Sequence, residues 1–113
     1  MSTSLQMTDG RQLALDDYGH LVNREDWSIE VAEQLAATDE MVLNEGHWLV
    51  LNILREYYDD FGIEPPMRVL VRIMTSKGGR EFANSLALYR LFPEGPARQG
   101  SRYAGLPIPV SCI

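Results

Sequence analysis

The chain has 113 residues, of which 45% are hydrophobic and 23% are charged, and its formal net charge is −6. This length suits one compact domain with a single hydrophobic core. The acidic balance disfavours nonspecific binding to nucleic acid, which needs clustered Lys and Arg side chains, and no apolar run reaches the ~18 residues that a membrane-spanning helix requires.

The first fifteen residues predict a β-hairpin. The short runs SLQM and RQLAL flank the tripeptide TDG, and its Asp9 and Gly10 form a strong turn dipeptide. A second turn is predicted from Asp16 to His20. Because a two-stranded hairpin is only marginally stable alone, we expect it to pack against the rest of the chain.

A first helix is predicted from about Asp26 to Thr38. Its apolar stripe consists of Trp27, Val31 and Leu35, which recur every four residues.

The second helix carries the clearest pattern. It is predicted from the N-cap Asn44 to about Phe61, immediately before Gly62. Its wide apolar face indicates the central helix of the domain. The face comprises Trp48, Val50, Leu51, Ile53, Leu54, Tyr57, Tyr58 and Phe61.

Three shorter helices are predicted in the second half. One runs from about Pro66 to Lys77 and ends at the glycine pair 78–79. The next begins at Asn84 or Ser85 and ends at Leu91, and a last short one begins near Pro96. The Pro66–Lys77 segment has apolar residues at helical spacing, namely Met67, Leu70, Val71 and Met74.

The last nine residues, GLPIPVSCI, are expected to form an extended arm, because Pro107 and Pro109 exclude a helix. The predicted fold is therefore mainly α (α+β): a bundle of about five helices with an N-terminal β-hairpin over residues 1–104, followed by a flexible C-terminal arm over residues 105–113. The arm has a terminal position and few large side chains, so we expect it to contribute little to stability.

Cys112 is the only cysteine and lies second from the end. A single cysteine cannot form an internal disulfide, and the N-terminal residues lack the pattern of a signal peptide, so we expect a cytoplasmic protein. An unperturbed thiol has a pKa of about 8.5, and the carboxylate of Ile113 disfavours its thiolate further. We expect activation either in a partner's basic or helix-N-terminal pocket or by Arg98 and Arg102 if the arm folds back. Position alone leaves two interpretations open, an incidental surface cysteine and a reactive thiol.

Other motifs give weaker signals. His20 and His47 are far apart and lack a second ligand nearby, so we expect no metal site and interpret each as a turn or surface residue. A basic edge on the helices around the glycine pair favours either an ordinary helix–turn–helix packing or a DNA-reading motif. That edge consists of Arg68, Arg72, Lys77 and Arg80.

Several motifs together resemble the DsrC/TusE family of sulfur-relay proteins. The C-terminal stretch NSLALYRLFPEGPARQGSRYAGLPIPVSCI matches in the elements NS, LYRLFP, GPA, AGLP and the penultimate cysteine. The segments EGHWLVLNILREYY, LREYYDDFGIEPPMRVL and DGRQLALDDYGHL also fit, so the resemblance covers nearly the whole chain.

The resemblance implies that Cys112 accepts sulfane sulfur as a persulfide, without a cofactor or metal, and that the protein is a sulfurtransferase. Two-cysteine DsrC proteins carry a second thiol eleven positions earlier, where this chain has Ser101. The chain therefore resembles the single-cysteine TusE branch, which takes sulfur from the TusBCD complex towards a tRNA 2-thiouridine synthase for wobble-uridine thiolation. The alternatives are a DsrC-like role in sulfur oxidation or its regulation, and a helix–turn–helix DNA-binding regulator.

Arg98 and Arg102 flank Ser101 and precede the arm. We expect them either to steer the arm towards an electronegative partner surface or to be ordinary solvated charges. Because the chain is acidic, recognition is expected through protein partners, with no direct nucleic-acid binding and no membrane contact.

Overall fold

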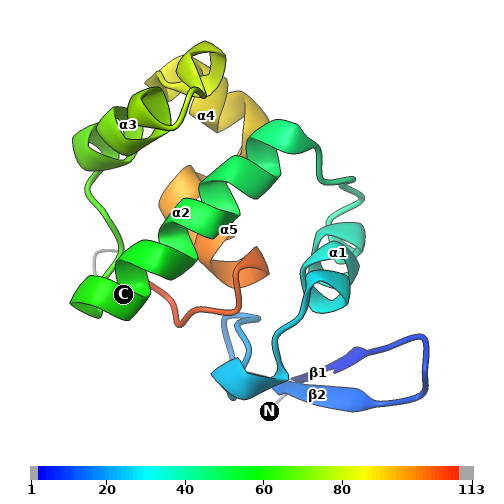
Figure 1. Ribbon diagram of the computed structural model, residues 1–113. Coiled ribbons are helices and arrows are strands. Elements are labelled where there is room, and N and C mark those ends of the chain that lie inside the picture. The colour runs from blue at the N-terminus through cyan, green and yellow to red at the C-terminus, as the bar shows by residue number, and fades with distance from the viewer. Residues whose placement is uncertain (1–2, 110–113) are drawn as a thin grey trace.

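The computed structural model describes residues 3–109 of the chain, and within them the predicted hairpin and five α-helices are all present (Figure 1). The elements in chain order are β1 Thr3–Gln6, β2 Gln12–Leu15, the 3₁₀ helix η1 Arg24–Asp26, α1 Ile29–Thr38, α2 Glu45–Phe61, α3 Met67–Ser76, the 3₁₀ helix η2 Arg80–Phe82, α4 Ser85–Leu91 and α5 Pro96–Tyr103.

The N-terminal hairpin is antiparallel, as predicted. Leu5 lies opposite Leu13, and the turn between the strands places Gly10 at a φ of 95°, which glycine adopts without strain. Leu5, Leu13 and Leu15 are buried, so one face of the hairpin joins the core.

Helix α1 begins three residues later than the sequence predicts. Ser28 is its N-cap and accepts a hydrogen bond from the backbone N–H of Val31. Trp27 precedes the cap with an extended backbone, so it lies outside the helix and does not belong to the predicted apolar stripe. The strong capping preference of serine outweighs the four-residue spacing that had included Trp27.

Helix α2 agrees closely with its predicted limits, and its first turn has a reciprocal cap. The side chain of Asn44 accepts from the backbone N–H of His47, and His47 Nδ1 accepts from the backbone N–H of Asn44 at 3.0 Å. His47 Nε2 therefore carries the proton and donates to the carbonyl of Leu91 at 2.7 Å. His47 is buried. It ties α2 to the end of α4 rather than lying on the surface.

Helix α5 packs against both α1 and α2 and occupies the centre of the bundle (Figure 1). Gly100 permits its close approach to α2, because a Cβ atom there would lie 2.8 Å from Cδ1 of Leu54. Helices α3 and α4 are both in contact with η2, and they lie at the end of the molecule away from the hairpin (Figure 1).

The structure describes the arm as far as Pro109, and Leu106 is only 2% exposed. Its side chain belongs to the same hydrophobic cluster as the helices. The expectation of a small contribution to stability therefore fails for this residue, because an apolar side chain follows directly on the chain reversal at Gly105. Cys112 lies outside the described residues.

Within residues 3–109, no helix is both long enough and apolar enough to cross a lipid bilayer.

Leu106→Ala should lower the free energy of unfolding by about 2–5 kcal/mol, as large-to-small changes in cores generally do. Ile108→Ala is the matched control and should cost less, because Ile108 is only half-buried. Urea denaturation of both variants measures the difference. Equal small losses would show that Leu106 is not part of the core in solution.

Candidate functional site

The candidate site is the region where α5 ends and the cysteine-bearing arm begins. We call residues 103–106 the arm base. Gly105 has a φ of 74°, the left-handed conformation that favours glycine. The ring of Trp27 packs against its Cα so closely that any Cβ atom would overlap it. The backbone conformation and the close contact both require glycine here.

Three side chains from the first half of the chain bind the backbone carbonyls of the arm base. Trp27 Nε1 donates to the carbonyl of Tyr103 at 2.8 Å, and Arg55 Nη1 donates to that of Ala104 at 2.7 Å. His20 Nδ1 is 2.8 Å from the carbonyl of Leu106. The last carbonyls of a helix lack partners within it. Trp27 and Arg55 supply partners for the carbonyls of Tyr103 and Ala104, where α5 ends, and His20 supplies one for Leu106, three residues further on. We call these three side chains the carbonyl clamp.

Arg55 and Trp27 also bind each other. The guanidinium carbon of Arg55 lies 3.7 Å from the centre of the Trp27 ring, which is a close cation–π contact. Burial lowers the pKa of Arg55, but guanidinium groups remain protonated in proteins. The clamp thus places one fixed positive charge under the arm base.

His20 is the most enclosed member of the clamp, at 1% exposure. Its backbone N–H donates to the Asp16 carboxylate at 3.0 Å, which holds the turn that positions the ring. Because a carbonyl only accepts hydrogen bonds, the neutral ring must carry its proton on Nδ1. Burial lowers the pKa of His20 and favours this neutral form. The sequence correctly predicts the turn, but His20 is not a surface residue.

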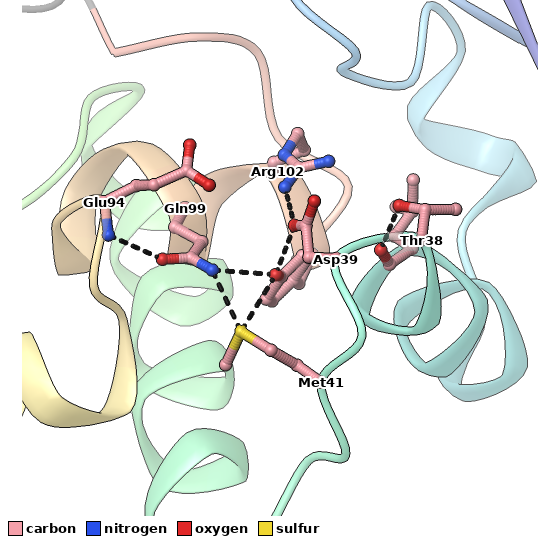
Figure 2. Close-up of polar contacts among 8 residues, drawn as sticks. Thr38, Asp39, Met41, Glu94, Gln99 and Arg102 are labelled. Atoms are coloured by element: carbon pink, nitrogen blue, oxygen red, sulfur yellow. Dashed lines mark hydrogen bonds and ion pairs between the residues drawn. The ribbon is translucent and has the colours of Figure 1, made fainter.

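A second set of contacts holds α5 to the segment that follows α1 (Figure 2). The guanidinium of Arg102 pairs with the carboxylate of Asp39, and the hydroxyl of Tyr103 donates to the same carboxylate at 2.5 Å. Gln99 Nε2 donates to the Tyr103 hydroxyl at 2.8 Å and to the sulfur of Met41 at 3.0 Å. Burial, with the Asp39 carboxylate adding to it, raises the pKa of Tyr103 to about 12.

The two arginines predicted to bind partners have different surroundings. Arg102 is turned towards Asp39, and its side chain is 16% exposed. Arg98 is exposed and forms no ion pair with any residue from 3 to 109. Ser101, between them, is buried, and its carbonyl accepts from the backbone N–H of Leu106 at 3.0 Å. Within the described residues, the structure brings Ser101 and Arg102 to the arm base but leaves Arg98 one turn away.

The clamp residues were not identified as site residues from the sequence. The sequence pattern places Trp27 in a helical stripe and predicts no role for Arg55. These side chains are amphipathic: each has an apolar body and a polar tip that needs a hydrogen-bond partner when it is buried. Their residue types therefore predict that each has a partner but do not predict which residue the partner is.

Comparisons with known proteins agree in family and fold. Residues 7–113 match the family described as DsrC like protein. The chain is 45% identical over 105 residues to a protein named Sulfurtransferase TusE from Photorhabdus laumondii subsp. laumondii, covering 93% of this chain and 95% of that protein. It is 46% identical to Sulfurtransferase TusE from Yersinia pseudotuberculosis, covering 93% and 97%.

Two solved structures resemble the whole fold. The NMR structure of Allochromatium vinosum DsrC has a TM-score of 0.85 at 45% identity, covering 100% of both chains. The crystal structure of the oxidized gamma-subunit of dissimilatory sulfite reductase (DsrC) from Archaeoglobus fulgidus has a TM-score of 0.84 at 38% identity, covering 98% of this chain and 100% of that one.

The two buried histidines, His20 of the clamp and His47 at the start of α2, predict a pH dependence of stability. Burial lowers the pKa of His20 and His47 from 6.5 in the folded protein. For His20, the Leu106 carbonyl and Asp16 oppose this shift, whereas Arg102 and Arg98 reinforce it. Below pH 6.5 the unfolded chain therefore binds more protons than the folded one, so the free energy of unfolding should fall as the pH falls.

Denaturant titrations between about pH 7 and pH 5 measure this slope. His20→Gln retains an N–H donor for Leu106 and should reduce the slope, while His47 maintains the remainder. An unchanged slope would show that His20 does not titrate differently in the folded and unfolded states.

Proposed function

The chain belongs to the DsrC-like protein family, and on that premise we propose that it is a sulfurtransferase that carries sulfur through a persulfide relay. The carrier residue in this proposal is Cys112. The observation that supports it best is the identity of about 45% with proteins named Sulfurtransferase TusE over 93% of the chain, in a sequence whose only thiol is Cys112.

The proposed chemistry needs only two thiols and one sulfane sulfur. The Cys112 thiolate attacks the outer sulfur of a donor cysteine persulfide. A new S–S bond forms on Cys112, the donor's S–S bond breaks, and the donor cysteine leaves as a thiolate. The next acceptor thiolate repeats the exchange. No net oxidation occurs, so no cofactor or external reductant is required.

The arm base suits this task because it fixes the start of the arm. Beyond Leu106, seven residues fully extended span at most about 25 Å. A persulfide on Cys112 can thus be offered within that radius of a rigid anchor. We propose that residues beyond the anchor form the flexible arm that inserts into a partner's pocket, where nearby positive charge lowers the pKa of the thiol.

Ser101 distinguishes the proposed role from two-thiol chemistry. A hydroxyl cannot form a disulfide with Cys112 or share a trisulfide with it. A DsrC-like role in sulfur oxidation or its regulation would therefore have to proceed with one thiol. The single-cysteine relay is the simpler proposal.

The proposed partners are a TusBCD-like donor complex and a tRNA 2-thiouridine synthase as acceptor, both in the cytoplasm. Arg98 is the stronger candidate for contacting them, since its guanidinium is exposed. Arg102 supports partner binding indirectly in this proposal, because its ion pair with Asp39 holds α5 in place. Direct binding of the carrier to tRNA is not part of the proposal.

The test is intact-mass spectrometry after incubation with a persulfide-loaded donor. The wild-type protein should gain the mass of one sulfur atom, and a reductant should reverse the gain. Cys112→Ser should abolish it, whereas Ser111→Ala, one residue away, should retain it. A reducible adduct that persists in Cys112→Ser would refute the proposed carrier residue.

A further inference from the structure

Charge is distributed very unevenly along the chain. Residues 1–65 contain three basic residues (Lys or Arg) and fourteen acidic ones (Asp or Glu). Residues 66–104 contain seven basic residues and two acidic ones. The second segment comprises α3, η2, α4 and α5. The overall charge of −6 thus conceals a basic end, formed by α3, η2, α4 and the start of α5.

Most arginines of this end have no partner among the residues that the structure describes. Elsewhere, basic side chains are engaged: Arg11 with Asp9, Arg24 with Asp59 and Arg55 with the arm base. In contrast, five arginines form no ion pair or side-chain hydrogen bond with any residue from 3 to 109. They are Arg68, Arg72, Arg80, Arg90 and Arg98.

A groove lies at the same end, between the start of α3, α4 and the start of α5. It encloses about 380 Å³, and its walls include Leu54, Pro65, Met67, Leu70, Tyr89 and Arg98. Tyr89 is 51% exposed, and Leu86, one turn earlier on α4, is 64% exposed. Apolar side chains thus line a hollow that has the exposed guanidinium of Arg98 at its edge. Glu94 also lines the groove and is the acidic group there.

The groove is close to the arm base. Arg98 and Tyr103 lie on the same helix, five residues apart, which corresponds to a rise of about 8 Å. A protein seated in the groove would therefore lie well inside the ~25 Å that residues 107–113 can span.

We propose that this groove and the basic end around it dock an acidic segment of a protein partner. An apolar side chain of that segment enters the groove beside Tyr89, and its carboxylates face Arg98 and the neighbouring arginines. The inference rests on the proposed function in one respect: the docked protein is the donor or acceptor of the sulfur.

A protein suits this surface better than a nucleic acid. The apolar walls and the exposed Leu86 and Tyr89 offer a desolvated centre with charges around it, which is the usual anatomy of a protein interface. A nucleic-acid duplex gains most of its affinity from phosphate contacts, and the fourteen acidic residues of the first segment oppose a long polyanion.

The test uses charge reversal at two places with the same change in net charge. Arg98→Glu alters the groove, and the control Arg11→Glu alters the hairpin turn at the other end of the molecule (Figure 1). Stopped-flow binding to the TusBCD-like complex and to the 2-thiouridine synthase should show association slowed about tenfold for Arg98→Glu at low salt, with a flatter salt dependence. Arg11→Glu should behave like wild type.

Tyr89→Ala tests the groove itself. It should raise the dissociation rate about tenfold and leave the salt dependence unchanged, because it removes an apolar anchor and no charge. Thermal unfolding of all three variants should match the wild type, since these side chains are exposed.

Loading of Cys112 by inorganic polysulfide separates this inference from the proposed function, because it needs no docked protein. Normal polysulfide loading with unaltered binding of both proteins by Arg98→Glu and Tyr89→Ala would overturn the docking surface alone. Absence of binding by the wild type would also overturn it. Loss of binding to free tRNA in Arg98→Glu, without any effect on either protein, would assign the surface to nucleic acid instead.

Discussion

The fold depends on how three backbone carbonyls at the arm base are satisfied. Two of them, the carbonyls of Tyr103 and Ala104, lie where α5 ends, and the third is that of Leu106, three residues further on. A buried carbonyl without a hydrogen bond is costly. Trp27, Arg55 and His20 supply the three donors. Because the donors come from three separate segments, the arm base joins parts of the first half of the chain that lie far apart in the sequence.

Helix α5 is organised so that one end is fixed and the other is accessible. At the fixed end, Arg102 and Tyr103 share the Asp39 carboxylate, and Gly105 allows the chain to turn under Trp27. At the accessible end, Arg98 faces solvent beside an apolar groove. This division suits the proposed sulfur carrier, in which the thiol would be presented from a rigid anchor and the proposed docking surface lies one or two turns away.

The sequence predicts the elements better than the site, for a physical reason. Helix α2 has local signals at both ends, the Asn44 cap and Gly62 in the left-handed conformation, and its limits follow from them. The predicted start of α1 is wrong, because Trp27 has the spacing of a helical residue but an extended backbone. The clamp joins residues 76 and 86 positions apart. Spacing within a helix carries no information about such pairs. The single cysteine drew attention to the arm, and the family resemblance favoured a reactive thiol over an incidental one.

The central claim is that the arm base packs into the core as far as Leu106. The backbone N–H of Leu106 donates to the Ser101 carbonyl at 3.0 Å. Native-state hydrogen exchange of this single amide, followed by NMR, therefore tests the claim directly. The account predicts that the Leu106 amide exchanges only on global unfolding, with the same free energy as the amides in the middle of α2. Exchange at the fast rate of a frayed chain end would contradict it.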